Sequence, residues 1–140
     1  MLEATAGELI LVRFSPMNTN KFIEQATDHA DYCGSQGEER VFAVSTFGDN
    51  LGEGESVEAL VTRVCQEVGC GGPRIWLVNG STLSREGYDA VLSEPPPRHH
   101  DVIMGNEQTI QDVEALAERA ETLVGLFVPG RERNPAWKRN

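Results

Sequence analysis

Residues 41–78 have the sequence VFAVSTFGDNLGEGESVEALVTRVCQEVGCGGPRIWLV, and the order of its apolar segments decides the predicted fold. Residues 41–47 form a short apolar run, which is typical of a buried β-strand. Ser56 is a suitable N-cap for a helix whose apolar residues recur at helical spacing. Gly69 suits the end of that helix, and residues 75–78 form the next apolar run. The segment therefore predicts a strand, a helix and a second strand.

The same alternation extends in both directions from this segment. Apolar runs at residues 8–14 and 100–104 predict two further strands, and a helical pattern follows each of them. A weaker helical pattern at residues 84–92 completes the order β-α-β-α-β-α-β-α. Strands that alternate with helices are usually joined by crossover connections. We therefore expect an α/β fold, with a compact four-stranded, mostly parallel, Rossmann-like sheet and helices on both faces. The alternative is a ferredoxin-like α+β fold, which applies if residues 84–92 are not helical and the last two strands pair antiparallel.

Length and charge limit what the chain does. Its 140 residues suffice for one domain, which we place at residues 1–130, followed by a tail at residues 131–140. The chain has 12 basic and 22 acidic side chains, a net charge of −10. Residues 1–130 hold eight basic and 21 acidic side chains, a charge of −13, whereas the tail carries +3. We expect no direct binding of nucleic acid, because phosphate binding needs clustered lysines and arginines.

The sequence also predicts a location. No apolar run approaches the length of a membrane span, and the first residues lack the pattern of a secretory signal. The three cysteines are an odd number, which argues against a disulfide scaffold. Ten arginines against two lysines suit a GC-rich, bacterial genome. We expect a cytoplasmic protein that contacts no membrane and carries no cofactor.

Small polar residues follow each predicted strand. In a parallel sheet the carboxyl ends of the strands and the N-termini of helices meet at one edge, and ligands bind there. The sequence thus predicts a crevice for a small polar molecule. Its candidate ligand-binding residues are Ser15, Asn18, Asp49, Asn79, Ser81 and Asn106. The alternative interpretation is that these side chains only cap helices and form turns, as they do in most loops.

The sequence contains no complete catalytic or metal-binding set. Asp49, Glu53 and Glu55 could bind a divalent cation, but their spacing matches no calcium loop, and we predict no metal site. His99 and His100 are adjacent at the start of a predicted strand, so their rings point to opposite faces. We interpret them as a loop-exposed pair that cannot share one proton or one metal ion.

The tail combines basic and aromatic side chains, which are common anchors of protein interfaces. Its candidate partner-binding residues are Arg131, Arg133, Trp137, Lys138 and Arg139. They predict that the tail docks onto the acidic body, or binds a protein partner or a second copy. We therefore expect a small acidic interaction or regulatory protein, comparable to inhibitor and immunity proteins, rather than an enzyme. The alternative is a small-ligand-binding domain or an enzyme that uses the predicted crevice.

Overall fold

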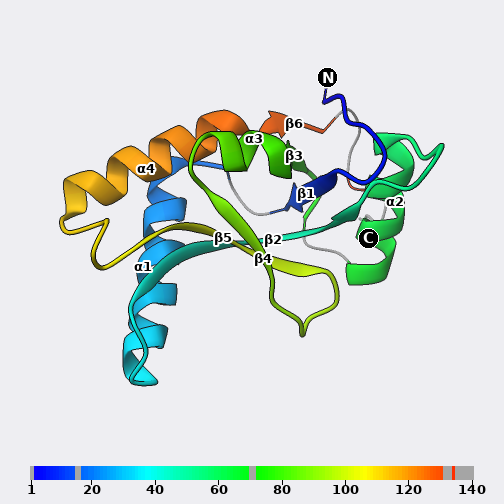
Figure 1. The fold of residues 1–140 in the computed structure, drawn as a ribbon. Helices are drawn as coiled ribbons and strands as arrows, with labels where there is room; N and C mark the ends of the chain where they lie inside the picture. Colours follow the sequence, from blue (N-terminus) through cyan, green and yellow to red (C-terminus); the bar gives the residue numbers. More distant parts are fainter. Residues whose placement is uncertain (1, 15–16, 70–71, 131–133, 135–140) are drawn as a thin grey trace.

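One layer of strands runs through the molecule, and helices pack against both of its faces (Figure 1). A computed structural model of the chain describes residues 2–14, 17–69, 72–130 and 134. Within these residues six strands form one sheet, in the order β4-β5-β2-β1-β3-β6. The strands are β1 (Leu9–Arg13), β2 (Val41–Asn50), β3 (Trp76–Asn79), β4 (Asp89–Leu92), β5 (His99–Asn106) and β6 (Val128–Pro129). All neighbouring strands are antiparallel.

The predicted four-stranded, mostly parallel, Rossmann-like sheet is therefore wrong. Helices do separate most of the strands, but strands that run in the same direction are not neighbours. Strands β2 and β3, for example, are joined through α2 and both pair antiparallel with β1, which lies between them. The predicted helix at residues 84–92 is also wrong, because a short helix ends at Arg85 and residues 89–92 form β4. The architecture is α+β, which is the class of the alternative prediction.

Four helices lie in the described part of the chain, and their starts follow from local sequence. They are α1 (Thr19–Ser35), α2 (Val57–Val68), α3 (Gly80–Arg85) and α4 (Val113–Leu126). Asn18, Ser56 and Asp112 are N-caps, and each side chain accepts the backbone N–H three residues further on. None of these helices is long and apolar enough to cross a membrane.

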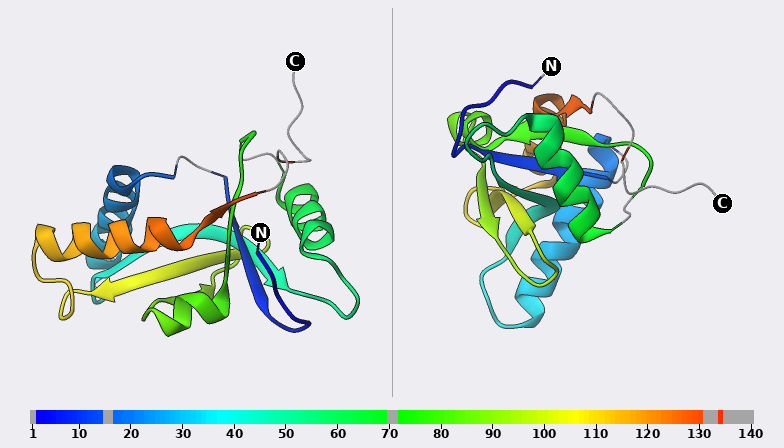
Figure 2. Two further views of the ribbon diagram at one scale, coloured as in Figure 1. Left: turned by 90° about the horizontal axis from the view of Figure 1, so that it is seen from above. Right: turned by 90° about the vertical axis from the view of Figure 1, so that its right-hand side faces the viewer.

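The sheet separates two apolar cores. Leu11 of β1 packs with buried residues of α1, α3 and α4 on one face of the sheet. Its neighbours Ile10 and Val12 point to the other face, where α2 supplies the cover. Figure 2 shows α2 at the opposite end of the sheet from α1 and α4. Gly48 allows β1 and β2 to approach closely, because a Cβ at this position would overlap the backbone of Ile10.

The first half of β2 extends beyond the end of β1. Strand β1 pairs only with residues 47–50 of β2, whereas β5 pairs with β2 from Val41 onward. The N–H of Gly48 donates to Arg98 O on the β5 side. Since backbone groups alternate in direction along a strand, those of Ser45 and Val41 face the side that β1 leaves open. An unpaired buried backbone group costs about 1–3 kcal/mol, so this side needs other partners.

Side chains take the place of the missing strand. Gln25 Oε1 in α1 accepts the Ser45 N–H at 2.7 Å, and the Arg13 guanidinium donates to the Ser45 carbonyl at 2.8 Å. Arg13 also donates to Gln25 Oε1 at 2.9 Å, which links the two side chains. Further along, Nδ1 of His29 lies 2.7 Å from the Val41 carbonyl. Helix α1 thus closes the open side of β2 with polar side chains.

Arg13 is buried to serve this role. It is 2% exposed and stacks over the ring of Phe22, with 4.5 Å from the guanidinium carbon to the ring centroid. Within the described residues its partners are oxygens of Gln25 and Ser45 and no carboxylate, and its Nε has no hydrogen-bond partner. Burial lowers the pKa of Arg13 to about 10, so the side chain still carries its charge at neutral pH.

A second arginine closes an open stretch of β5. Strand β4 pairs with β5 only as far as Ile103. Beyond that point Arg119 of α4 donates to the carbonyls of Met104 and Gly87, at 3.1 and 2.8 Å. Its guanidinium lies over the ring of Tyr88, 3.9 Å from the centroid. Both arginines therefore combine stacking on an aromatic ring with hydrogen bonds to strand carbonyls.

The Gln25 contacts can be tested by substitution. Gln25→Ala leaves the Ser45 N–H without an acceptor and Arg13 with the Ser45 carbonyl alone, and we expect the free energy of unfolding in urea to fall by about 2 kcal/mol. Gln25→Glu keeps the acceptor and places a carboxylate beside the buried cation, so it should preserve or raise stability at neutral pH. Glu24→Ala, at the exposed neighbouring position, is the control and should change stability by less than about 0.5 kcal/mol. Equal losses in all three variants would contradict this account.

Candidate functional site

Most of the predicted ligand-binding side chains are used locally. Asn18 and Asn79 are the N-caps of α1 and α3, where each side-chain oxygen accepts a backbone N–H. Asn106 accepts two backbone N–H groups of the turn that follows β5. Ser15 lies outside the described residues. The described amides therefore do what the alternative interpretation expected, which is to cap helices and turns.

The antiparallel sheet also places the predicted ligand-binding residues at two opposite ends of its strands. Asp49 and Asn79 both pair in register with Ile10, one from each side of β1. Neighbouring strands lie about 4.8 Å apart, so the backbones of these two residues are about 10 Å apart. Asn18 follows β1 and Asn106 is the last residue of β5. Both of these strands are antiparallel to β2, so the two residues lie at the opposite end of the sheet's strands from Asp49. The structure brings together part of the predicted set and not the whole.

Asp49 is the centre of an ion-pair network, so its carboxylate is already bound and is not a free ligand-binding group. Its Oδ2 lies 2.6 Å from Arg63 NH1 and 3.3 Å from Arg98 NH1. Arg63 also binds Glu55, with Nε at 2.7 Å from Oε2. Arg98 binds Glu67 at 3.1 Å. The network connects the end of β2, helix α2 and the loop between β4 and β5.

The network shifts the ionisation of its acids. The hydrogen bond from Arg63, with a second one from the Gly52 N–H, lowers the pKa of Glu55 to about 2. Burial alone would raise the pKa of Asp49, but hydrogen bonds from Arg63 and from the Asn50 N–H, with the charge of Arg98, hold it below its ordinary value. Both carboxylates are therefore ionised and already bound to arginine at neutral pH.

An acidic hollow of about 650 Å³ lies beside this network, between the N-terminal segment and the start of α2. Its acidic lining residues are Glu3, Glu8, Glu55 and Glu58. Its apolar lining residues are Leu2, Ala4, Leu51 and Val57. Ser81, one of the predicted ligand residues, donates a hydrogen bond to Glu8 at the rim. Carboxylates next to apolar surface suit a lysine or arginine side chain, which has an apolar stem and a cationic head.

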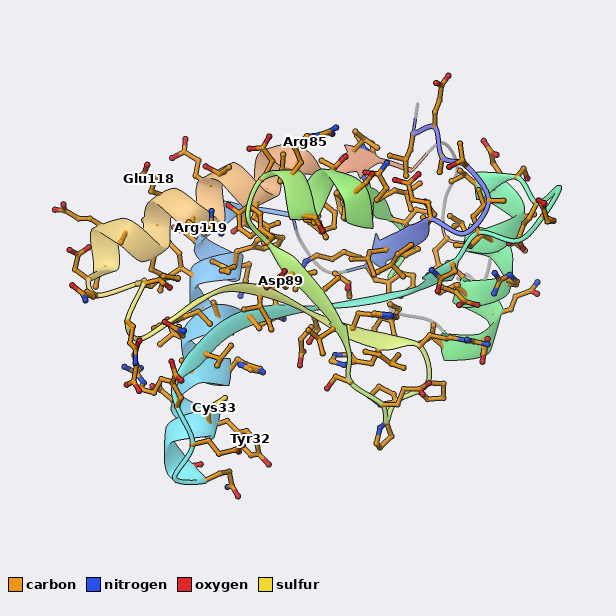
Figure 3. The ribbon with its side chains drawn as sticks, in the orientation of Figure 1. Tyr32, Cys33, Arg85, Asp89, Glu118 and Arg119 are labelled. Carbon is orange, nitrogen blue, oxygen red and sulfur yellow. The ribbon has the colours of Figure 1, made fainter. Side chains whose placement is uncertain are left out.

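Four of the eight basic side chains of residues 1–130 are bound to backbone carbonyls or within the ion-pair network. Arg13 and Arg119 are bound to backbone carbonyls, and Arg63 and Arg98 are bound within the network. Figure 3 shows Glu118 pointing away from the sheet on the outer side of α4, whereas Arg119 points inward. Arg13 and Arg119 thus place their charge against strand carbonyls, whereas Lys21, Arg74 and Arg85 are exposed on the surface together with the carboxylates.

Asp101 lies between two imidazole rings on the sheet. Its carboxylate oxygens are 3.6 Å from Nε2 of His29 and 3.9 Å from Nε2 of His99. His99 and His100 belong to β5 and are largely covered, so the prediction of a loop-exposed pair is wrong. Their alternation along β5 does place the two rings on opposite faces of the sheet. Among the described residues, no three histidine, cysteine or carboxylate side chains are arranged to hold a metal ion.

One residue of the tail can be placed. Asn134 is buried, and its backbone N–H and side-chain Nδ2 donate to the carbonyls of Pro73 and Gly72, at 2.9 and 2.8 Å. This contact continues from β6, which pairs with β3. The predicted partner-binding residues Arg131, Arg133, Trp137, Lys138 and Arg139 lie outside the described residues. The tail thus meets the body at Asn134.

A search of known protein families, of curated proteins and of solved structures finds no match to this chain. The site must therefore be judged on its own geometry.

The acidic hollow is the feature that the sequence prediction missed. Its glutamates come from two segments that are far apart in the chain, residues 3–8 and 55–58, and neither segment follows a motif. A usable signal was present in the density of glutamate around the start of α2, where Glu53, Glu55 and Glu58 lie within six residues. The folding of the N-terminal segment against α2 could not be derived from that density.

The ion-pair network predicts a defined acid sensitivity. Because the folded-state pKa of Glu55 lies below its unfolded value of about 4.5, its contribution is complete above that pH and is lost as the pH falls towards about 2. Asp49 has the same sign. Arg63→Gln should reduce this loss, so its unfolding free energy should decline less between about pH 5 and pH 3 than that of the wild type. Urea unfolding at both pH values measures the difference. The control is Lys21→Gln, and parallel declines in all three proteins would refute the role of the network.

Proposed function

We propose that this protein is a non-enzymatic interaction module that binds a basic segment of a protein partner. The acidic hollow carries the proposal, because four glutamates line one concavity beside apolar surface. A lysine or arginine of the partner would place its stem against Leu51 and Val57 and its charged head among the carboxylates. This protein would inhibit or regulate that partner in the bacterial cytoplasm.

The internal use of arginine supports this proposal. If Arg13 and Arg119 lay free on the surface, they would neutralise part of the carboxylate charge. Arg63 binds Glu55, which lines the hollow, and Arg13 and Arg119 bind backbone groups elsewhere. An excess of negative potential steers cationic segments toward the protein and raises association rates at low ionic strength.

The tail fits the same proposal in a second way. Its +3 charge and its tryptophan match the chemistry of a segment that the acidic surface would bind. Arg131, Arg133, Trp137, Lys138 and Arg139 would then engage the body of the same chain, a second copy or a partner. A synthetic peptide of residues 131–140 is therefore a natural competitor for any external basic segment.

A second hollow favours the alternative of a small-ligand-binding protein. It measures about 520 Å³ and lies where β5 extends past β4. Asn106, a predicted ligand residue, lines it together with Asp89, Thr109 and the cationic Arg119. These groups would suit a small polar molecule with an anionic group. A rise in melting temperature with a nucleotide or a sugar phosphate, abolished by Asn106→Ala, would support this alternative over the first.

The proposed function is tested with a tetralysine peptide and the full chain. We expect calorimetric binding that weakens with added salt. The double variant Glu3→Gln/Glu58→Gln should bind the peptide about tenfold more weakly or worse, since each lost charge contact at 4 Å is worth about 1 kcal/mol in water. Glu118→Gln/Glu121→Gln removes the same charge from α4 and is the matched control.

Two results would reject the hollow as the binding site. One is an equal loss of affinity in both double variants, which would indicate a diffuse effect of net charge. The other is the absence of salt-dependent binding to the wild type.

A further inference from the structure

Strand β4 is an open edge of the sheet. Its other side pairs with β5, and the Ser93 N–H continues that ladder to His99 O. Since backbone groups alternate along a strand, the N–H and C=O groups of Ala90 and Leu92 point away from β5. No hydrogen bond within the described part of the chain occupies these outward groups. They are free to pair with another strand.

The edge has only part of the usual protection against pairing. Edge strands are commonly protected by short length, charged side chains, proline, a bulge or a covering element. Strand β4, Asp89-Ala-Val-Leu92, is short and carries one carboxylate, but it has no lysine, no proline and no bulge. Val91 is 46% exposed and Leu92 is 58% exposed, and they are two of four large apolar side chains exposed within the described residues. Because successive residues point to opposite faces, each face of the sheet presents one apolar side chain at this edge.

The charges around the edge select the type of partner. Asp89 lies on the same face as Val91, two residues away, and Asp101 is the register partner of Val91 across the ladder. Glu94 follows the strand and is exposed. A second copy of this chain would bring a further set of these carboxylates to the same edge, which repulsion disfavours. A basic segment from another protein would be attracted.

We infer that β4 binds an extended, basic segment of a partner protein, which adds to the sheet as an antiparallel strand. A valine or isoleucine of the segment lies beside Val91, and a lysine lies opposite Asp89. The outward backbone groups of Ala90 and Leu92 supply the hydrogen bonds. This surface shares no residue with the acidic hollow, and the inference stands whether or not the hollow binds a partner.

The probe is the peptide Lys-Thr-Val-Val-Thr-Lys, whose antiparallel alignment places its lysines opposite Glu94 and Asp89. We expect the full-length protein to bind it and to show chemical-shift changes at residues 89–93. Replacing the first valine of the peptide, which lies opposite Leu92, by proline removes an N–H that would donate to β4, and it should weaken binding about tenfold. Equal binding of both peptides would overturn the inference, because charge alone would then explain the binding.

Two protein variants locate the site. Ala90→Pro removes an outward N–H and leaves the ladder with β5 intact, so it should abolish binding while the unfolding transition remains cooperative. Val91→Lys should also abolish binding, because its positive charge repels the basic peptide, and it places no constraint on the backbone. The matched control is Val113→Lys, an exposed valine on α4 that should bind the peptide like the wild type. Unchanged binding in Val91→Lys would refute the site.

Sedimentation of the protein alone decides between occupants. If β4 binds a partner, the chain sediments as the same species at all concentrations with or without Val91→Lys. A dimer that Val91→Lys dissociates would show that a second copy takes the edge, and would overturn the inference.

Discussion

The hydrogen bonds that join Arg13, Gln25 and Ser45 determine how the rest of the molecule is arranged. Strand β2 is twice as long as β1. About half of the β2 backbone groups that face β1 would therefore have no strand to pair with. The pair Arg13–Gln25 supplies the donor and the acceptor that a strand would have supplied. This fixes α1 beside the sheet, against α4, and leaves the opposite face for α2. Arg119 applies the same solution where β5 extends past β4.

These contacts connect the fold to the surface charge. A guanidinium with its multiple donors can satisfy carbonyls that point in different directions, and its flat face can stack on an aromatic ring. Each arginine used in this way removes a positive charge from the exterior. The ion pairs of Arg63 and Arg98 have a similar effect. With two of its eight basic side chains bound to strand carbonyls and 21 acidic side chains, the body carries an excess of surface carboxylates, which is the basis for proposing a basic partner.

Most of the local elements were predictable from sequence, with β4 in place of a predicted helix as an exception, but the pairing and direction of the strands were not. The apolar runs near residues 41–47 and the stripes of α2 and α4 follow from periodicity and capping alone. The prediction of a parallel sheet was wrong because the alternation of strands and helices does not specify which strands become neighbours. Strands β2 and β3 run in the same direction, but β1 lies between them and pairs antiparallel with both. The deciding contacts of α1 are polar ones from Gln25 and His29, which a search for apolar stripes overlooks. Among candidate site residues, the capping role of Asn18 and Asn79 was an available alternative. The hollow and the Asp101 contacts depend on segments distant in sequence.

Amide hydrogen exchange at Ser45 tests the central claim most directly. If Gln25 and Arg13 replace a strand, the Ser45 N–H should exchange about as slowly as amides within the β2–β5 ladder, and far more slowly than the outward N–H of Ala90. Exchange of Ser45 at the rate of Ala90, with the ladder amides still protected, would contradict the account. It would show that the open side of β2 is accessible to water and that α1 is held by apolar packing alone.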